Sequence, residues 1–194
     1  MIFTSEQVSC GHPDKICDQI SDAIVTDCLQ HDKLSRVAVE CMIKDYQVTI
    51  AGEITSSHLP NYELLTRTVL NRIGLPRVGR YQVRTIITQQ SPDIALGVDG
   101  NHGAGDQGMM FGYATDETPE MLPIPFAVAT RALQTLREFS SALFLPDAKA
   151  QVSFDYDSWK ITSFLISTQH QADISVEELR PIIEAIMETA ATDY

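Results

Sequence analysis

The sequence predicts an α+β fold built from two related modules, each a small mixed sheet covered by helices on one face. The order helix, hairpin, helix occurs twice, at an offset of roughly 112 to 114 positions (12 to 124, 61 to 175). Within each copy, alternating apolar residues indicate strands and apolar residues at helical spacing indicate helices. We place the modules at residues 12–100 and 101–194, and residues 1–11 are a candidate to pair with the second.

The first module shows clear start and stop signals. Gly11 or His12 can cap a helix whose first position is Pro13, where the missing N–H costs nothing. The remaining predicted elements are strands over 36–43 and about 48–55, a helix capped by Asn61 and ended by Gly74, and a strand over 81–89.

The second module repeats this order up to its last helix. A helix is expected to begin near Pro125, followed by hairpin strands over about 151–157 and 159–168. Ser175 and Glu178 form a capping box for the last helix, and Pro181 is expected to kink that helix or delay its start. No strand follows to match 81–89, which predicts an unpaired sheet edge and a sequence that ends inside a fold.

Composition bounds the function. The 194 residues carry 26 acidic and 14 basic side chains, a net charge of −12, which argues against nucleic acid as a partner. The acidity suits a phosphorylated small molecule bound through metal ions, a basic partner protein, or simply solubility. No apolar run reaches membrane-span length, so we expect no membrane partner and a cytoplasmic location. The four separated cysteines are expected to be buried reduced thiols.

Several polar residues are candidates for chemistry. His12 and Asp14, at a helix start, can hold a phosphate chain and a divalent ion, although helix capping alone is favoured about two to one on periodicity. Glu40 lies on the strand face opposite Val39, and Glu53 closes the second hairpin strand. Either carboxylate binds a cation or is simply solvated.

A glycine-rich segment holds the sharpest motif. Five of the ten glycines fall between 97 and 108, and Gly103-Ala-Gly-Asp-Gln-Gly108 frames Asp106 on a tight loop. Its glycine spacing differs from the dinucleotide fingerprint. Further on, Pro146-Asp-Ala-Lys149 places a lysine just before a predicted strand, where an ordinary surface charge is the alternative.

Taken together, these motifs identify a family. Gly11-His-Pro-Asp-Lys15, Gly52-Glu-Ile-Thr55, Gln90-Ser-Pro-Asp93 and the segment 103–108 resemble S-adenosylmethionine synthase (methionine adenosyltransferase), and 111–115, 146–149 and 165–170 continue the match in family order. The resemblance implies three related α+β modules, and a reaction in which methionine sulfur attacks the 5′ carbon of ATP. Triphosphate leaves and is hydrolysed to phosphate and diphosphate.

The resemblance also implies residue roles. His12, Asp147 and Lys149 resemble ATP contacts, and His12, Asp14 and Lys149 are the catalytic set. The implied cofactors are Mg²⁺ and K⁺. The other implied roles are Asp14 as a magnesium ligand, Glu40 as a carboxylate linked to potassium, and Glu53, Gln90 and Asp106 as methionine-binding residues, with 90–102 as a loop over the site.

Family chains are about twice this long. We therefore expect a split enzyme, in which a second protein chain carries the C-terminal half, in a hetero-oligomer containing a dimer of this chain. The alternatives are a non-catalytic regulatory or scaffold relative that binds a complete synthase, a truncated relic, and an unrelated ATP-dependent phosphotransferase.

Overall fold

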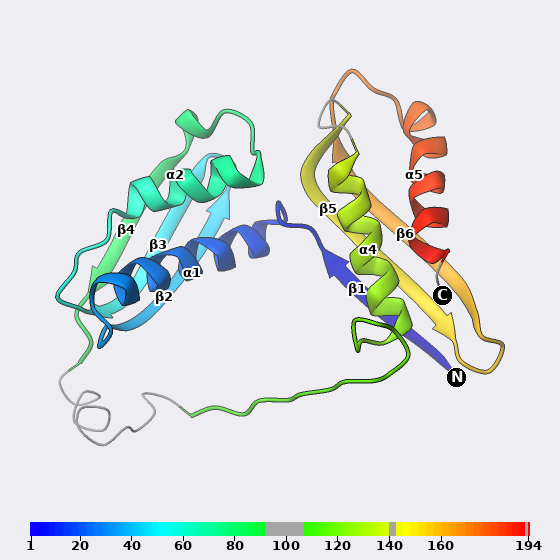
Figure 1. Ribbon diagram of the computed structural model, residues 1–194. Helices are drawn as coiled ribbons and strands as arrows, with labels where there is room; N and C mark the ends of the chain where they lie inside the picture. Colours follow the sequence, from blue (N-terminus) through cyan, green and yellow to red (C-terminus); the bar gives the residue numbers. More distant parts are fainter. Residues whose placement is uncertain (92–106, 140–142, 193) are drawn as a thin grey trace. The chain divides into compact units, whose positions relative to one another are not determined.

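The computed structural model describes residues 1–91, 107–139, 143–192 and 194. The chain divides into two compact units, each with one three-stranded sheet. The β3 unit comprises Ile16–Arg72 and Pro76–Gly112, and the β5 unit comprises Met1–Lys15, Ile73–Leu75 and Tyr113–Tyr194. The predicted mixed α+β architecture with small sheets is confirmed (Figure 1).

The β3 unit contains a hairpin and a parallel strand. Its elements are α1 (Pro13–His31, begun in the β5 unit), β2 (Arg36–Lys44), β3 (Gln47–Thr55), α2 (Tyr62–Ile73), the 3₁₀ turn η1 (Val78–Arg80) and β4 (Gln82–Thr88). β2 and β3 are antiparallel, whereas β4 is parallel to β3, because α2 forms the crossover between them. Both helices cover the same face of the sheet (Figure 1).

Local chemistry sets the ends of these helices as predicted. α1 begins at Pro13, and its stripe of buried residues is Ile16, Ile20, Ile24 and Cys28. The Asn61 side-chain oxygen accepts a hydrogen bond from the Leu64 N–H (3.0 Å) at the start of α2. Gly74, with φ of 89°, follows the last residue of α2, where the left-handed backbone favours glycine.

Gly52 allows β2 and β3 to approach closely. Its φ is 147°, and a Cβ atom added there would lie 2.0 Å from the backbone oxygen of Ala38. A larger residue would therefore separate the two strands just before Glu53.

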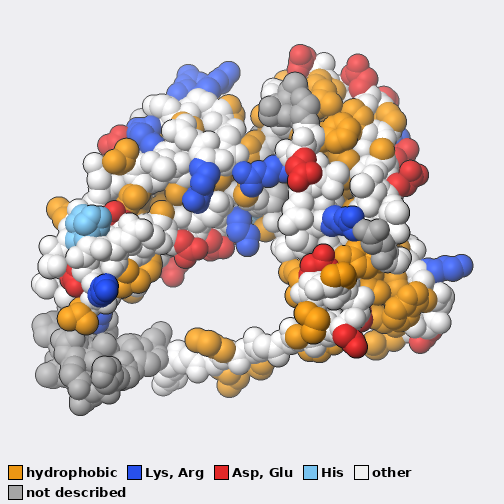
Figure 2. Space-filling view, in the orientation of Figure 1, with side chains coloured by type: hydrophobic (Ala, Val, Ile, Leu, Met, Phe, Trp, Pro, Cys, Tyr) orange, Lys and Arg blue, Asp and Glu red, His pale blue; other side chains and the backbone are white. Residues whose placement is uncertain are grey.

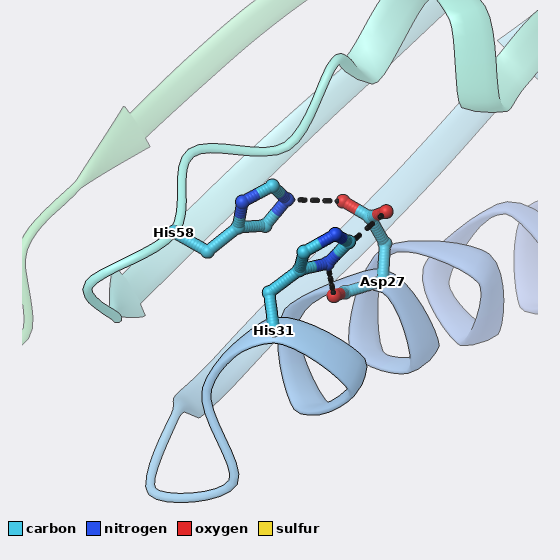
Figure 3. A group of neighbouring side chains, drawn as sticks. All are labelled: Asp27, His31 and His58. Atoms are coloured by element: carbon cyan, nitrogen blue, oxygen red, sulfur yellow. Dashed lines mark hydrogen bonds and ion pairs between the residues drawn. The ribbon is translucent and has the colours of Figure 1, made fainter.

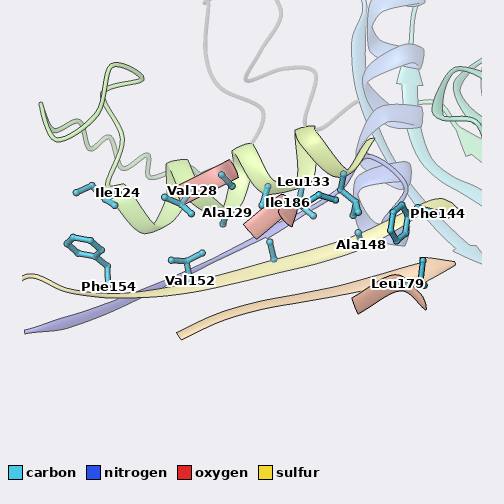
Figure 4. Packing of buried hydrophobic residues seen from close by; sticks show 14 residues of the cluster. Ile124, Val128, Ala129, Leu133, Phe144, Ala148, Val152, Phe154, Leu179 and Ile186 are labelled. Carbon is cyan, nitrogen blue, oxygen red and sulfur yellow. The ribbon is translucent and has the colours of Figure 1, made fainter. Parts of the chain in front are cut away.

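The β5 unit is an antiparallel sheet of order β1-β5-β6 covered by two helices. Its elements are β1 (Ile2–Val8), α4 (Ile124–Glu138), β5 (Phe144–Asp155), β6 (Lys160–His170) and α5 (Val176–Ala191). The core lies between the sheet and the helices, and Val128, Val152, Phe154 and Ile186 in it are almost fully buried (Figure 4). Residues 1–11, a candidate to pair with this half, contribute β1, which pairs with β5 along its whole length.

Two predictions for this unit were wrong in detail. β5 begins at Phe144 rather than near 151, because its first residues pair with the end of β6 (Phe144 with His170), and a register shift between Phe144 and Ala148 accommodates Pro146, which has no N–H. Lys149 therefore lies inside a strand rather than before one. α5 begins at Val176, so Pro181 does not delay it; the capping box of Ser175 and Glu178 is present as predicted.

The two sheets differ in which hairpin strand is central. In the β3 unit the second hairpin strand, β3, lies in the middle; in the β5 unit it is the first, β5. β6 is consequently an edge strand, and in the described ranges no further strand pairs with its outer side. Among the helices that the structure describes, none is long and apolar enough to cross a membrane.

Candidate functional site

Ser9 joins the segment before His12 to strand β5. Its N–H donates to the Ala148 carbonyl (2.9 Å), and the Ala148 N–H donates to its hydroxyl oxygen (2.8 Å). The same hydroxyl donates to the Pro146 carbonyl (2.6 Å). Ser9 thus contacts the residues on both sides of Asp147, and it holds together two motifs that lie far apart in the sequence.

Gly11 continues this junction. A Cβ atom added to Gly11 would lie 2.4 Å from the backbone carbon of Pro146, so only glycine lets the two segments approach this closely. The next N–H, that of His12, donates to the Ser9 carbonyl (3.1 Å). His12 is therefore held by backbone contacts beside the strand that carries Asp147 and Lys149.

His12 and Asp14 present complementary groups at the start of α1. The Asp14 N–H donates to His12 Nδ1 (3.3 Å), which leaves the ring proton on Nε2 and makes Nε2–H a hydrogen-bond donor. The imidazole is only 14% exposed, whereas the Asp14 carboxylate is 92% exposed. A buried ring with one directed donor suits a phosphate oxygen, and an exposed carboxylate suits a hydrated cation.

Lys149 points to the face of the sheet that the helices leave open. Its neighbours Ala148 and Ala150 are buried against the helices, so the alternation of the strand turns Lys149 the other way. Lys149 Nζ lies 3.9 Å from the carboxylate of Glu6 on β1, and both side chains are about half exposed. Both groups can rearrange around a ligand.

The carboxylates of Glu40 and Glu53 share one face of the β3 unit. Glu40 is exposed between residues of β2 that turn to the helices, as the alternation predicted, and Glu53 is half-buried. Glu53 pairs with Ala38 and Glu40 pairs with Ala51, so the two glutamates lie diagonally across the hairpin. Two carboxylates on one face attract a cation.

Gln90 contacts Arg36, a residue that the sequence patterns did not single out. Arg36 Nε donates to Gln90 Oε1 (2.7 Å), which orients the amide. Arg36 pairs with Thr55, whose buried hydroxyl oxygen has no hydrogen-bond partner among the residues described. Thr55 belongs to the Gly52–Thr55 motif, and this membership is the one sequence signal that points to Thr55. No sequence pattern predicted the contact between Arg36 and Gln90.

The predicted residues thus fall into two groups. His12, Asp14, Asp147 and Lys149 belong to the β5 unit, where the contacts of Ser9 and Gly11 bring their two segments together, and Glu40, Glu53 and Gln90 belong to the β3 unit. Asp106 and most of its glycine-rich motif lie outside the described residues. A cavity of about 380 Å³ in the β5 unit, lined by β1, α4 and the start of β5, is not lined by His12, Asp147 or Lys149.

Comparison with known proteins decides the family. A model of the N-terminal domain of S-adenosylmethionine synthetase matches residues 1–92, and a model of its central domain matches residues 101–194. The chain belongs to the S-adenosylmethionine synthase family. Together the two matches span nearly the whole chain.

Curated S-adenosylmethionine synthases show the same relationship. The synthase of Nocardia farcinica is 42% identical over 92% of this chain and 51% of its own length. The synthases of Prochlorococcus marinus strain MIT 9301 and Parasynechococcus marenigrum are 44% and 43% identical over 94% and 96% of this chain, and again over 51% of their own. The chain spans about half the length of the curated relatives it matches.

The residues of this synthase-family chain fit the two implied cations. The exposed Asp14 carboxylate provides the hard oxygen that Mg²⁺ prefers, next to a helix start that attracts phosphate. The exposed Glu40 carboxylate, with Glu53 on the same face, would suit a potassium ion by donor type.

Proposed function

We propose that this chain is a subunit of a split S-adenosylmethionine synthase. It forms S-adenosylmethionine from ATP and methionine with release of phosphate and diphosphate, and a second protein chain supplies the missing half of the site. The single observation that carries the proposal is the Ser9 junction, which holds His12 beside the strand carrying Asp147 and Lys149. Family membership supports the reaction type.

The first step is a displacement at the 5′ carbon of ATP. A lone pair of the methionine sulfur forms the S–C bond while the C–O bond breaks, and both of its electrons leave with the triphosphate. Sulfur loses no proton, so no general base is needed. His12 Nε2–H donates to the oxygen that acquires charge, and the Lys149 ammonium binds the phosphate chain, which lowers the barrier by stabilising that charge.

In the second step a water molecule cleaves the triphosphate. The water oxygen forms a bond to phosphorus while a bridging P–O bond breaks, so that one phosphate and one diphosphate result. No oxidant or reductant is needed. Asp14 would hold Mg²⁺ on the phosphates, and Asp147 would contact ATP. Bound there, the ion neutralises phosphate charge. His12 and Lys149 keep the same phosphate contacts in both steps.

Methionine recognition is assigned to the other group. The Glu53 carboxylate binds the ammonium of methionine, and Gln90, oriented by Arg36, hydrogen-bonds its polar end. Asp106 is proposed to act at the same end of the substrate. Glu40 holds K⁺ nearby, which offsets carboxylate repulsion on this face.

Charge supports a partner. The assigned residues supply five carboxylates, from Asp14, Glu40, Glu53, Asp106 and Asp147, but the only ammonium among them is that of Lys149. A triphosphate requires more positive charge than this, so we assign further cations to the second chain. The outer edge of β6, which pairs with no strand among the described residues, offers a place for added structure. The proposed assembly contains a dimer of this chain.

The test is synthesis by the tagged chain purified from the soluble fraction of its native cell, which also tests the cytoplasmic location. ATP, methionine, Mg²⁺ and K⁺ should yield S-adenosylmethionine, with a second protein co-purifying. An active single longer polypeptide would overturn the split arrangement and leave the reaction standing. If the preparation is inactive but alters the kinetics of a complete synthase, the regulatory alternative is correct. A phosphorylated product would indicate a phosphotransferase.

A further inference from the structure

Three side chains outside the proposed active site gather at the end of α1. Asp27 and His31 occupy the last turn of that helix, four residues apart, and His58 comes from the segment between β3 and α2 (Figure 3). One potential ligand atom from each residue lies within 4.8 Å of the other two. Imidazole groups are visible on the surface over this end of α1 (Figure 2). All three residues lie in the β3 unit.

The cluster is already ordered by direct contacts. His58 Nε2 lies 2.7 Å from Asp27 Oδ2, and the rings of His31 and His58 stack with centroids 4.0 Å apart. His31 Nδ1 lies 2.8 Å from the backbone oxygen of Asp27. Since a carbonyl can only accept, Nδ1 carries the proton, and the lone pair of His31 is on Nε2.

This pattern matches the environment of a metal-binding histidine. Such a histidine usually donates its second ring N–H to a carbonyl or carboxylate, which fixes the tautomer, and His31 does so. His58 and Asp27 now share a hydrogen bond. A cation would take the place of the proton shared by His58 and Asp27, which would leave to solvent, and the two atoms would move apart to the ~3.3 Å separation expected of neighbouring tetrahedral ligands. The stacked rings of His31 and His58 would turn so that both lone pairs face the ion.

A second layer of hydrogen bonds holds His58 in place. The Asp32 carboxylate accepts from the N–H of Ser57 (2.8 Å) and from its hydroxyl (3.0 Å). The Ser56 hydroxyl is 2.7 Å from that of Ser35 and accepts from the His58 N–H (3.0 Å). The segment bearing His58 is thereby attached to the residues that follow α1, so the backbone that carries its imidazole is held in place without a ligand.

We propose that Asp27, His31 and His58 form a binding site for a divalent transition metal ion of the zinc class. Two imidazoles and one carboxylate favour Zn²⁺ and its neighbours over Mg²⁺, which prefers oxygen ligands alone. His31 is about half exposed, which leaves a fourth position open to water. The ion would link the end of α1 to the segment before α2, independently of the proposed synthase reaction.

The test uses Zn²⁺ alone with the full chain. We expect saturable binding of one ion at this cluster, a melting temperature that rises with Zn²⁺, and an affinity lowered more than about tenfold in H31Q and in H58Q. H170Q is the matched control, because His170 lies on β6 in the other unit, and it should bind like the wild type. Should H58Q fail to fold, the more exposed H31Q still decides.

The cysteines are competing ligands that the same experiment resolves. Co²⁺ substitution gives sulfur-to-metal charge-transfer absorption only when thiolates bind, and the proposed site should lack it. Binding that persists unchanged in both histidine variants, or that shows thiolate absorption, would overturn the proposal. Failure of the wild type to bind Zn²⁺ would mean that the cluster is only hydrogen-bonded.

Discussion

Ser9 and Ala148, 139 positions apart in the sequence, exchange two hydrogen bonds, one through the Ser9 N–H and one through its hydroxyl. The same hydroxyl donates to Pro146, so one small side chain satisfies polar groups on both sides of Asp147. In the proposed synthase this contact determines where His12 lies relative to Lys149. The first prediction follows from it.

Replacing Ser9 by alanine removes the hydroxyl and leaves the Ala148 N–H without its partner. We expect S9A to lower the free energy of unfolding by about 1–3 kcal/mol and to raise the KM for ATP. Denaturant titration and initial rates measure the two effects. S163A, at an exposed serine of β6, is the control and should change neither. An S9A variant with wild-type stability would show that the contact is dispensable.

Replacing Gly11 by alanine tests the same junction, because it adds a side-chain carbon there. G11A places a Cβ 2.4 Å from Pro146 and must push the two segments apart, at a cost of about 1–3 kcal/mol. G79A is the matched control, because a Cβ there meets no atom within 4 Å. Thermal melts of the two variants should differ clearly. Equal melting temperatures would contradict the close approach.

Lys149 and Asp106 test the proposed chemistry. K149A should reduce kcat by about 100- to 1,000-fold in the assembled enzyme, because it removes the cation that binds the leaving phosphates. D106A is expected to abolish synthesis. Size-exclusion chromatography should show normal assembly for both variants. K160A, at an exposed lysine on β6, should keep its activity. Full activity in K149A or D106A would refute the corresponding assignment.

Replacing Glu53 distinguishes binding of methionine from binding of ATP. E53Q removes the carboxylate proposed for the methionine ammonium, so the KM for methionine should rise about tenfold or more, while that for ATP changes little. Steady-state kinetics with each substrate varied in turn give both values. E188Q, at an exposed position of α5, is the control. A rise confined to the KM for ATP would reverse the assignment.

Glu178 gives a pH-dependent prediction. Hydrogen bonds from the Ser175 N–H and hydroxyl hold the pKa of the Glu178 carboxyl below its usual value. A carboxyl with a lowered folded-state pKa adds stability that is present above its unfolded-state pKa and is lost as the pH falls through its folded-state pKa. The difference in melting temperature between wild type and E178Q should therefore shrink as the pH is lowered below the ordinary pKa of a glutamate carboxyl. E184Q, at an exposed position of the same helix outside the capping box, is the control.

Signals that act within a few residues were read correctly from the sequence. Pro13 begins α1, Asn61 caps α2, and Ser175 with Glu178 forms the capping box of α5, because each of these signals depends on neighbouring backbone groups. The exposed face of Glu40 followed from strand alternation in the same way. What the sequence missed is long-range: the start of β5 depends on pairing with the end of β6, and the Arg36–Gln90 contact joins segments 54 positions apart. Periodicity carries no information on such pairs.

The placement of β1 affects the order in which the chain can fold during synthesis. Ile2–Val8 leave the ribosome long before Phe144–Asp155, which form β5, the strand that pairs with β1 among the described residues. In the interval the strand has exposed hydrogen-bonding groups, and the hairpin of β2 and β3 can form before it. A fragment beginning at residue 101 would consequently lack one edge of its sheet, so dissection of this protein should retain the first eight residues together with the second half.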